Sequence, residues 1–331
     1  MSRAAVLGTG SWGTAFAATM TDAGTSVTMW GRREEVVGQV NSGFNEEYLP
    51  GIALPAGLRA TTDPAEALAG ASIVVLAVPS QTLRANLARW GSLPGEAAVV
   101  SLMKGVELGT AMRMSEVIAE VGGVGRERIV VVSGPNLAGE IARKQPAASV
   151  LACEREAVAD SVAAACAAPY FRPYTNTDVL GTELGGAVKN VVALAVGMAG
   201  GMGMGDNAKA SIITRGLAET ARLGAALGAD PATFMGLAGV GDLVATCLSP
   251  LSRNRTFGEN LGHGMSVGEV SAVTRRTAEG VKSCASILEL ARRHGVDMPI
   301  VEGVVAVVDG RLTPRAVVEL LMARSRKGEQ D

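Results

Sequence analysis

Lys189 is the residue in this chain best suited to proton transfer. It lies in the apolar stretch ELGGAVKNVVALAVGMAGG, where Glu183 is the only other charged residue. An ammonium on a buried helix loses hydration, which favours its neutral form and suits a proton donor and acceptor. A lysine whose stem covers apolar surface while its charge reaches water would explain the position equally well. Lys189 alone leaves both interpretations open.

Lys104 and Asp242 are further candidates for polar chemistry. Lys104 directly follows an apolar, strand-like run, VVSLM. Ligands of open α/β sheets bind outside the carboxyl ends of the strands, which is where this lysine is expected. A lysine on a surface loop explains its position as well. Asp242 stands between Gly241 and the apolar run LVATCL, a setting that indicates packed surroundings.

A glycine-rich turn near the start of the chain predicts a dinucleotide site. Residues Gly8 to Gly13 read GTGSWG, after the strand-like RAAVL and before the helical TAFAATM. Gly8 permits a tight turn, Gly10 lets the backbone approach a pyrophosphate, and Gly13 lets the helix pack closely on the strand. The helix N-terminus offers free N–H groups to the anion. A βα turn without a ligand is the alternative.

Two arginines follow the second predicted strand, VTMW, where NAD sites usually place an acid. The sequence reads Gly31-Arg32-Arg33, and Glu34 and Glu35 come only afterwards. A carboxylate at the strand end binds the ribose 2′-hydroxyl, whereas arginine suits a 2′-phosphate. The pattern therefore favours NADP as cofactor and leaves NAD open. Two solvated charges at the start of a helix are the alternative.

Two polar turns are candidates for holding an anionic substrate. Residues 133–136, Ser-Gly-Pro-Asn, follow the strand-like RIVVV, and residues 252–255, Ser-Arg-Asn-Arg, open a predicted helix. An arginine and an asparagine at a helix N-terminus suit a phosphate or carboxylate group. A solvated polar turn without a ligand is the alternative in both places.

The elements that must position these residues fall into two halves. Seven apolar, strand-like runs alternate with helical runs up to about Leu180: RAAVL, SVTMW, LRATT, SIVVLAV, AAVVSLM, RIVVVSG and AASVLAC. This alternation predicts an α/β fold, with an N-terminal Rossmann-type doubly wound parallel sheet in residues 1–180. Long Ala/Leu/Val-rich stretches then predict an all-α domain in residues 181–331. Residues 190–205 are too short and glycine-rich for a membrane span and are predicted to form a core helix.

Composition limits the kinds of partner that we expect. The formal net charge of -2 gives no electrostatic reason to expect nucleic acid or an anionic membrane. The four cysteines are widely spaced, without a CxxC pair, which indicates reduced thiols of a cytoplasmic protein and no metal site. We assign no chemistry to the two histidines. The expected partner is a small molecule, and a homodimer is left open.

Taken together, these motifs resemble one family, the bacterial NAD(P)-dependent glycerol-3-phosphate dehydrogenases. The similar segments spread from residue 8 to about 281: GTGSWGTA, SLMKGVE, SGPNLAGE, GGAVKNVVALAVG, GLAGVGDLVATC, SRNR and TAEGV. The resemblance implies reduction of dihydroxyacetone phosphate to sn-glycerol 3-phosphate, the head of phospholipid synthesis. It also implies a Rossmann domain followed by a helical domain.

The resemblance carries roles onto individual residues. Lys189 becomes the general acid/base, with Lys104 and Asp242 as further catalytic residues. Asp242 is expected to orient either Lys189 or a substrate hydroxyl, and the sequence leaves both open. Substrate is expected on Lys104, Gly134, Asn136, Lys189, Asp242, Ser252, Arg253 and Asn254. The cofactor is expected on Gly8, Gly10, Ser11, Trp12, Gly13, Arg32, Arg33, Lys104, Ala138, Arg253 and Glu279. Asn136 departs from the family, which more often has Ser or Thr there, so the contact at that position is open.

Two rival functions are weighed against this one. A two-domain reductase of the 3-hydroxyacid dehydrogenase type would take a carboxylate where we place a phosphate. A regulatory protein that binds NADP without turnover would have a decayed site, yet Lys104, Lys189, Asp242 and Arg253 are all present. Assays with dihydroxyacetone phosphate and with short oxo acids separate these functions.

Overall fold

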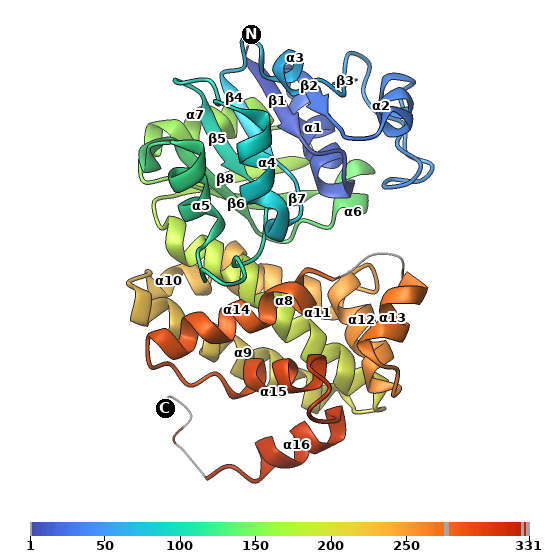
Figure 1. The fold of residues 1–331 in the computed structure, drawn as a ribbon, viewed down its shortest axis with the longest axis vertical. Helices are drawn as coiled ribbons and strands as arrows, with labels where there is room; N and C mark the ends of the chain where they lie inside the picture. Colours follow the sequence, from blue (N-terminus) through green and yellow to red (C-terminus); the bar gives the residue numbers. More distant parts are fainter. Residues whose placement is uncertain (1, 275–277, 326–327, 329–331) are drawn as a thin grey trace.

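An eight-stranded sheet forms the centre of the N-terminal half of the protein (Figure 1). The structure is a computed structural model that describes residues 2–274, 278–325 and 328. The strand order is β3-β2-β1-β4-β5-β6-β7-β8, and neighbours are parallel except for β6 and β7. The strands are β1 (Arg3–Leu7), β2 (Ser26–Trp30), β3 (Arg59–Thr61), β4 (Ile73–Leu76), β5 (Ala98–Ser101), β6 (Ile129–Ser133), β7 (Ala147–Ala152) and β8 (Phe171–Asn176).

Helices cover both faces of this sheet, because successive side chains of a strand point to opposite faces. On β1, Val6 belongs to the apolar cluster that contains Phe16, whereas Leu7 belongs to the cluster that contains Leu83. Because helices cover both faces of β1, every position of this strand after Arg3 carries a buried apolar residue. The helices of this half are α1 (Ser11–Asp22), α2 (Glu34–Asn41), α3 (Pro64–Leu68), η1 (Ser80–Thr82), α4 (Leu83–Trp90), α5 (Met114–Gly122), η2 (Arg126–Arg128), α6 (Ala138–Ala142) and α7 (Glu156–Cys166).

The far edge of the sheet differs in detail from the predicted pattern. β7 runs antiparallel to β6, because the chain between them holds only the five-residue α6 and returns from the carboxyl edge. The eighth strand, FRPYTN, was not predicted at all. It is an edge strand with mostly exposed or half-exposed residues and a proline, so it lacks the apolar run that marks buried strands.

The C-terminal half is helical and is built around α8 (Val179–Gly201), which passes from the sheet into the centre of this half (Figure 1). A helix that is apolar all round is expected to be buried on all sides, and α8 packs against α9, α11, α12 and α14. The prediction of a core helix here is confirmed. The remaining helices are α9 (Asp206–Leu227), α10 (Pro231–Phe234), η3 (Leu237–Gly241), α11 (Asp242–Leu248), α12 (Arg253–Gly262), α13 (Val267–Thr274), α14 (Glu279–Arg293), α15 (Pro299–Val308) and α16 (Pro314–Met322).

Glycines bring the backbones of α8 and α12 into direct contact. A Cβ added to Gly197 would lie 2.1 Å from the carbonyl oxygen of Arg255, and one added to Gly258 would lie 2.1 Å from that of Leu194. Gly201 and Gly262, one turn further along each helix, face the partner helix in the same way. The spacing between α8 and α12 is therefore set by main-chain contact.

Candidate active site

Asp242 joins the two predicted lysines in one buried cluster. Its Oδ2 accepts a hydrogen bond of 2.6 Å from Lys104 Nζ, and its Oδ1 accepts one from Lys189 Nζ. The Asp242 side chain is 1% exposed, the Lys189 side chain 9% and the Lys104 side chain 13%. The structure thus brings together three residues that lie far apart in the sequence, with one carboxylate between two ammonium groups.

Each member of the cluster is held by a different element. Lys104 follows β5 at the carboxyl edge of the sheet, Lys189 lies in the buried middle of α8, and Asp242 begins α11. Lys104 Nζ also donates to the carbonyl oxygen of Gly134, at 3.1 Å, in the turn after β6. Carboxyl ends of neighbouring parallel strands meet at one edge, which explains why β5 and β6 both contribute.

Burial changes the protonation behaviour of Lys104. Desolvation lowers the pKa of Lys104 to about 8, an effect that the charge of Asp242 opposes and that of Lys189 reinforces. Burial thus brings the pKa of Lys104 closer to neutral pH than that of an ordinary lysine. Such a group is common at functional sites, where proton transfer is most effective near the operating pH.

Two polar residues of this cluster were not predicted from the sequence. Thr246, one helical turn after Asp242, accepts a hydrogen bond of 2.6 Å from Lys189 Nζ. Asn190 donates to the carbonyl oxygen of Lys104 at 3.3 Å, and its own Oδ1 accepts from Asn254 at 2.9 Å. The spacing of four residues between Asp242 and Thr246 was the available signal, because it places both on one face of a helix.

The predicted anion-binding turn lies at the N-terminus of α12. Ser252 is its N-cap, and the Ser252 hydroxyl accepts from the backbone N–H of Arg255. Asn254 is 8% exposed and is tied to Asn190 and to the backbone N–H of Gly280, which donates to its Oδ1. Arg253 is exposed in the first turn. Asn254 therefore connects this helix start to the segment that carries Lys104.

Asn136, the residue that departs from the family pattern, lies in the turn after β6. Its Nδ2 donates to Ser149 Oγ at 3.0 Å, and Ser149 in turn donates to the carbonyl oxygen of Ser133. Its Oδ1 is buried and has no hydrogen-bond partner among the described residues. Buried polar atoms are normally satisfied, so this oxygen marks a place where a hydroxyl donor would fit.

The glycine-rich turn has the form of an anion cradle. Gly8 adopts φ 132°, a conformation that favours glycine, and a Cβ there would lie 2.3 Å from the carbonyl oxygen of Ala77. Gly10 is the N-cap of α1 without a side-chain capping bond, and a Cβ on Gly10 would meet nothing within 4 Å. The Trp12 Nε1 is buried without a partner in the described part of the chain. Open space beside uncapped N–H groups fits a dinucleotide pyrophosphate.

The segment 45–52 packs over this turn and was not predicted to take part in the site. Asn45 is completely buried and its Nδ2 donates to the Thr9 carbonyl oxygen at 3.0 Å. The Ser11 hydroxyl donates to the Tyr48 carbonyl oxygen at 2.9 Å. Apolar contacts add to these bonds, because Leu49 packs in one cluster with Trp12, Ala138 and other residues. The predicted cofactor residues Ser11, Trp12 and Ala138 therefore share one neighbour, this segment.

Arg32 and Arg33 follow β2, next to the glycine-rich turn. The two places are close because Trp30 pairs with Leu7 and its carbonyl oxygen accepts from the N–H of Gly8. Both arginines are exposed. Arg33 forms a 2.5 Å ion pair with Glu47, and this pair raises the pKa of the Arg33 guanidinium above its usual range.

The last predicted cofactor residue, Glu279, begins α14. Its Oε2 accepts a hydrogen bond of 2.7 Å from Ser80 Oγ, in the short η1 turn that follows β4. Ser80 belongs to the sheet half and Glu279 to the helical half, so this bond joins the two. Thr277, the first residue of the TAEGV motif, lies outside the described residues.

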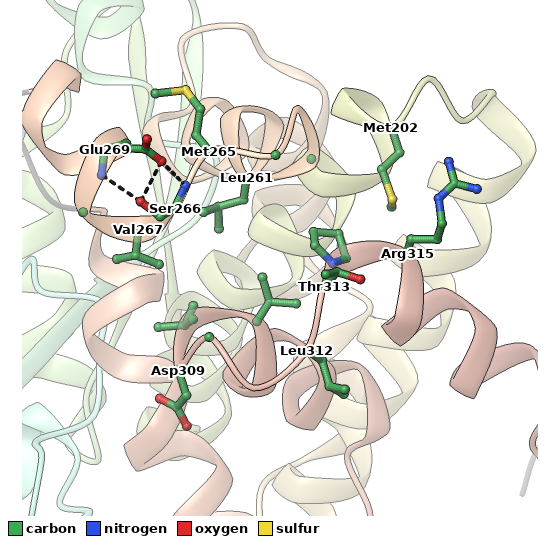
Figure 2. Close-up of a pocket in the computed structure, with 17 residues that line it drawn as sticks. Met202, Leu261, Met265, Ser266, Val267, Glu269, Asp309, Leu312, Thr313 and Arg315 are labelled. Atoms are coloured by element: carbon green, nitrogen blue, oxygen red, sulfur yellow. Dashed lines mark hydrogen bonds between the residues drawn. The ribbon is translucent and has the colours of Figure 1, made fainter.

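A hollow of about 630 Å³ lies between the segment that joins α12 to α13 and the segment that joins α15 to α16 (Figure 2). Its lining includes Met202, Leu261, Met265, Leu312 and Arg315. Among the described residues, none of the predicted catalytic, substrate or cofactor residues lines it. Ser266 and Glu269 in its wall hydrogen-bond to each other. The hollow is therefore separate from the lysine cluster.

Two helical stretches, Val179–Gly201 and Pro231–Leu248, are long and apolar enough to cross a membrane by length and composition alone. In the first, 83% of the apolar window is buried inside the protein. The second consists of α10, η3 and α11 and carries Asp242. The described residues contain no group of three or more His, Cys, Asp or Glu side chains that could hold a metal ion.

Comparison with known proteins gives a consistent result over nearly the whole chain. The N-terminal and C-terminal family models of NAD-dependent glycerol-3-phosphate dehydrogenase match residues 3–159 and 178–319. A glycerol-3-phosphate dehydrogenase [NAD(P)+] of Streptomyces coelicolor is 67% identical over 99% of this chain and 98% of its own length. Its counterpart in Thermobifida fusca is 63% identical over 100% of this chain and 99% of its own length.

A solved structure is similar as well. The crystal structure of glycerol-3-phosphate dehydrogenase from Coxiella burnetii has a TM-score of 0.92 and 35% identity, covering 98% of this chain and 99% of that chain. The matched regions include both the sheet half and the helical half, and with them the strand ends and helices that carry the lysine cluster. The resemblance found in the sequence is confirmed: this chain belongs to the family of NAD-dependent glycerol-3-phosphate dehydrogenases.

Proposed function

We propose that this protein reduces dihydroxyacetone phosphate to sn-glycerol 3-phosphate with NADPH or NADH, using Lys189 as the general acid/base. Residues 1–180 would hold the cofactor, and residues 181–331 would supply Lys189 and the phosphate site. One observation carries this proposal: Asp242 holds the ammonium groups of Lys104 and Lys189 together in a buried cluster at the carboxyl edge of the sheet.

Lys189 is the proton donor in this proposal. The nicotinamide cofactor, when bound, supplies the hydride for the ketone carbon. Negative charge then develops on the ketone oxygen, and a proton moves from Lys189 Nζ to that oxygen to complete the hydroxyl group. The neutral amine left on Lys189 regains a proton from solvent. A positioned general acid of this kind typically contributes about 10²–10⁴-fold in rate.

Lys104 and Asp242 support this proton transfer in different ways. Lys104 adds positive potential near the developing oxyanion, in surroundings from which water is largely excluded. Asp242 uses one oxygen for each lysine, so its role is to position both ammonium groups. Thr246 adds a second contact to Lys189 and limits the directions in which Nζ can point.

The phosphate of the substrate is assigned to the start of α12. Arg253 lies in the first turn of that helix, where the backbone N–H groups and the helix dipole favour an anion. The link Asn254–Asn190–Lys104 fixes this helix start relative to the lysine cluster. Asn136, with its buried and unpartnered Oδ1, is assigned to a substrate hydroxyl.

The cofactor is assigned to the glycine-rich turn and the end of β2. The uncapped start of α1 would bind the pyrophosphate, and Arg32 and Arg33 would meet a 2′-phosphate. The product is the starting alcohol of phospholipid synthesis. We infer a cytoplasmic enzyme, since all four cysteines are buried free thiols. A homodimer is the assembly that we would test first.

The test of this function is turnover of the Lys189→Met variant. Methionine keeps the volume of the stem and removes the charge, so the fold should persist. We expect kcat with dihydroxyacetone phosphate and NADPH to fall by roughly 10²–10⁴-fold. NADPH binding, followed by fluorescence, should change little because the glycine-rich turn lies in the other half of the protein.

Lys209→Met is the matched control, because Lys209 lies on α9 and pairs with Asp206 near the surface. Its turnover should remain close to that of the wild type. A Lys189→Met enzyme that is folded and within tenfold of wild-type turnover would refute the assignment. Parallel assays with short oxo acids test the substrate, since a preference for them would favour the 3-hydroxyacid dehydrogenase type of reaction.

A further inference from the structure

Glu47 brings a carboxylate to the end of β2, although it lies in a later segment of the chain. The strand is followed by Gly31, Arg32 and Arg33, with no carboxylate at the position typical of NAD sites. The segment 45–52 nevertheless brings a carboxylate to the same place, because Glu47 Oε2 lies 2.5 Å from Arg33 Nη2. An acid and a guanidinium therefore stand side by side where the adenosine ribose is expected.

The position of Glu47 is fixed by its neighbours in the chain. Asn45, two residues earlier, is completely buried and is bonded to Thr9 and Thr14 of the glycine-rich turn and α1. Tyr48, the next residue, accepts from the Ser11 hydroxyl through its backbone. The backbone that carries Glu47 is thus tied to the cofactor cradle on both sides.

The Arg33 side chain is held between Glu47 and Tyr48. Arg33 Nη2 lies 3.4 Å from Tyr48 Oη, and the guanidinium carbon lies 5.8 Å from the centre of the Tyr48 ring. The Arg33 and Glu47 side chains are 46% and 40% exposed. An exposed ion pair contributes little to stability, so a ligand can replace one partner at small cost.

We propose that Glu47 is the ribose-recognition acid of this site and sets its preference between NADPH and NADH. This inference rests on the proposed function, in which Arg33 meets a 2′-phosphate. A 2′-hydroxyl can donate to the Glu47 carboxylate, whereas a 2′-phosphate is repelled by it and must compete with it for Arg33. The same pair would thus allow either cofactor to bind.

Removal of the Glu47 charge should act on the two cofactors in opposite directions. In Glu47→Gln, Arg33 is released for the 2′-phosphate and the repulsion disappears, so NADPH should bind more tightly. NADH should bind more weakly because an amide is a poorer acceptor than a carboxylate. We expect the ratio of the two dissociation constants to change by about fivefold or more, the size of one surface ion-pair contribution.

Binding of nucleotide fragments tests this without catalysis. Adenosine 2′,5′-bisphosphate and adenosine 5′-monophosphate differ only at the 2′ position, and calorimetry on the full-length protein gives Kd for each. The Kd values of NADPH and NADH, from fluorescence titration, provide a second measurement. Glu46→Gln is the matched control, because Glu46 is an exposed neighbouring acid that accepts from the N–H of Gly51 instead of from Arg33.

Glu47→Gln should tighten the bisphosphate and weaken the monophosphate, while Glu46→Gln changes both by less than twofold. Suppose that Glu47→Gln leaves the ratio of the bisphosphate and monophosphate Kd values unchanged, while Arg33→Gln still weakens the bisphosphate selectively. This result overturns the role of Glu47 and leaves the proposed cofactor site intact. If Arg33→Gln and Glu47→Gln both leave the ratio unchanged, the 2′ end of the cofactor binds elsewhere, and the inference fails with that assignment. A shift of equal size in Glu46→Gln also overturns the inference, since the loss of any negative charge in this segment would then explain the effect.

Discussion

This protein contains a buried and an exposed arginine–glutamate ion pair, and the difference in burial gives the two pairs different roles. Arg113 and Glu183 form a 2.9 Å pair whose side chains are 13% and 1% exposed, at the place where α5 of the sheet half meets α8. Arg33 and Glu47 form a 2.5 Å pair with side chains 46% and 40% exposed. The groups are the same and only their surroundings differ.

The buried pair is part of a complete network, whereas the exposed pair lies at the surface. Glu183 also accepts from the N–H and the hydroxyl of Ser115, and Arg113 also pairs with Glu116. Loss of one partner would leave charge uncompensated in a place that water reaches poorly. At the exposed pair, water and salt compensate each charge. The first pair therefore links α5 of the sheet half to α8, and the second is the pair that we propose exchanges partners with a ligand.

The largest effect should come from removal of the buried charge. Glu183→Gln removes the negative charge that compensates the Arg113 guanidinium. It also places an amide N–H₂ group opposite the N–H and hydroxyl of Ser115, which are donors and need an acceptor. We expect it to lower the free energy of unfolding by about 3 kcal/mol, measured by urea denaturation. Glu47→Gln is the control from the exposed pair and should change it by less than about 0.5 kcal/mol. Similar values for both variants would show that burial does not distinguish the two pairs.

A smaller effect is expected at a third glutamate, which is held by backbone groups. Glu219 is 1% exposed, and its carboxylate accepts from the N–H groups of Ile300 and Val301 at the start of α15. Burial raises the pKa of Glu219 to about 7. Between about pH 4.5 and 7 the folded state therefore binds more protons than the unfolded chain, so the contribution of Glu219 to stability is lost as pH rises.

Urea denaturation of wild type and Glu219→Gln across pH 4.5–8 measures this contribution. The wild type should lose about 2 kcal/mol relative to the variant between about pH 5 and pH 7, because glutamine does not titrate. A constant difference between the two proteins at all pH values would contradict the raised pKa.

The smallest expected effect is the change in the coupling energy of the exposed ion pair with salt concentration. A double-mutant cycle on Arg33 and Glu47 should give a coupling energy below about 1 kcal/mol at low ionic strength, falling toward zero in 1 M salt. The cycle on Arg113 and Glu183 should keep most of its coupling in the same salt, because buried pairs are screened much less. Equal salt sensitivity of the two cycles would remove the distinction between the pairs.

The sequence was sufficient to locate candidate site residues at the ends of regular elements. The apolar strands predicted the sheet, and Lys104 and the glycine-rich turn were located from the carboxyl ends of β5 and β1. The contact of Lys104 with Asp242 was not predicted, because no local pattern reports the direction of a side chain across 138 residues. The contact of Lys189 with Asp242 was one of the two roles that the resemblance left open for Asp242. The resemblance alone had assigned these three residues to one site.

Other features of the protein had little or no local signal in the sequence. The segment 45–52 contains no helix or strand, so its position over the glycine-rich turn depends on non-local bonds from Asn45 and to Tyr48. Glu183 was visible as a charge in an apolar helix, but its partner Arg113 lies 70 residues earlier. β8 was missed because an edge strand needs only one neighbour and tolerates polar residues and proline.

The glycine contact between α8 and α12 has a consequence for motion. Lys189 is carried by α8, and Arg253 is carried by α12, whose backbones touch at Gly197 and Gly258. Main-chain atoms in contact leave no side-chain rotamers to rearrange at these glycines, so we expect the two helices to move together. A rotation of the sheet half would therefore alter the separation of Lys104 from Lys189, which Asp242 bridges, while we expect the separation of Lys189 from the start of α12 to stay nearly constant. In the proposed function, the distance between the ketone and the phosphate of the substrate is therefore set within the helical half, and a rotation of the sheet half would change only how the cofactor approaches them.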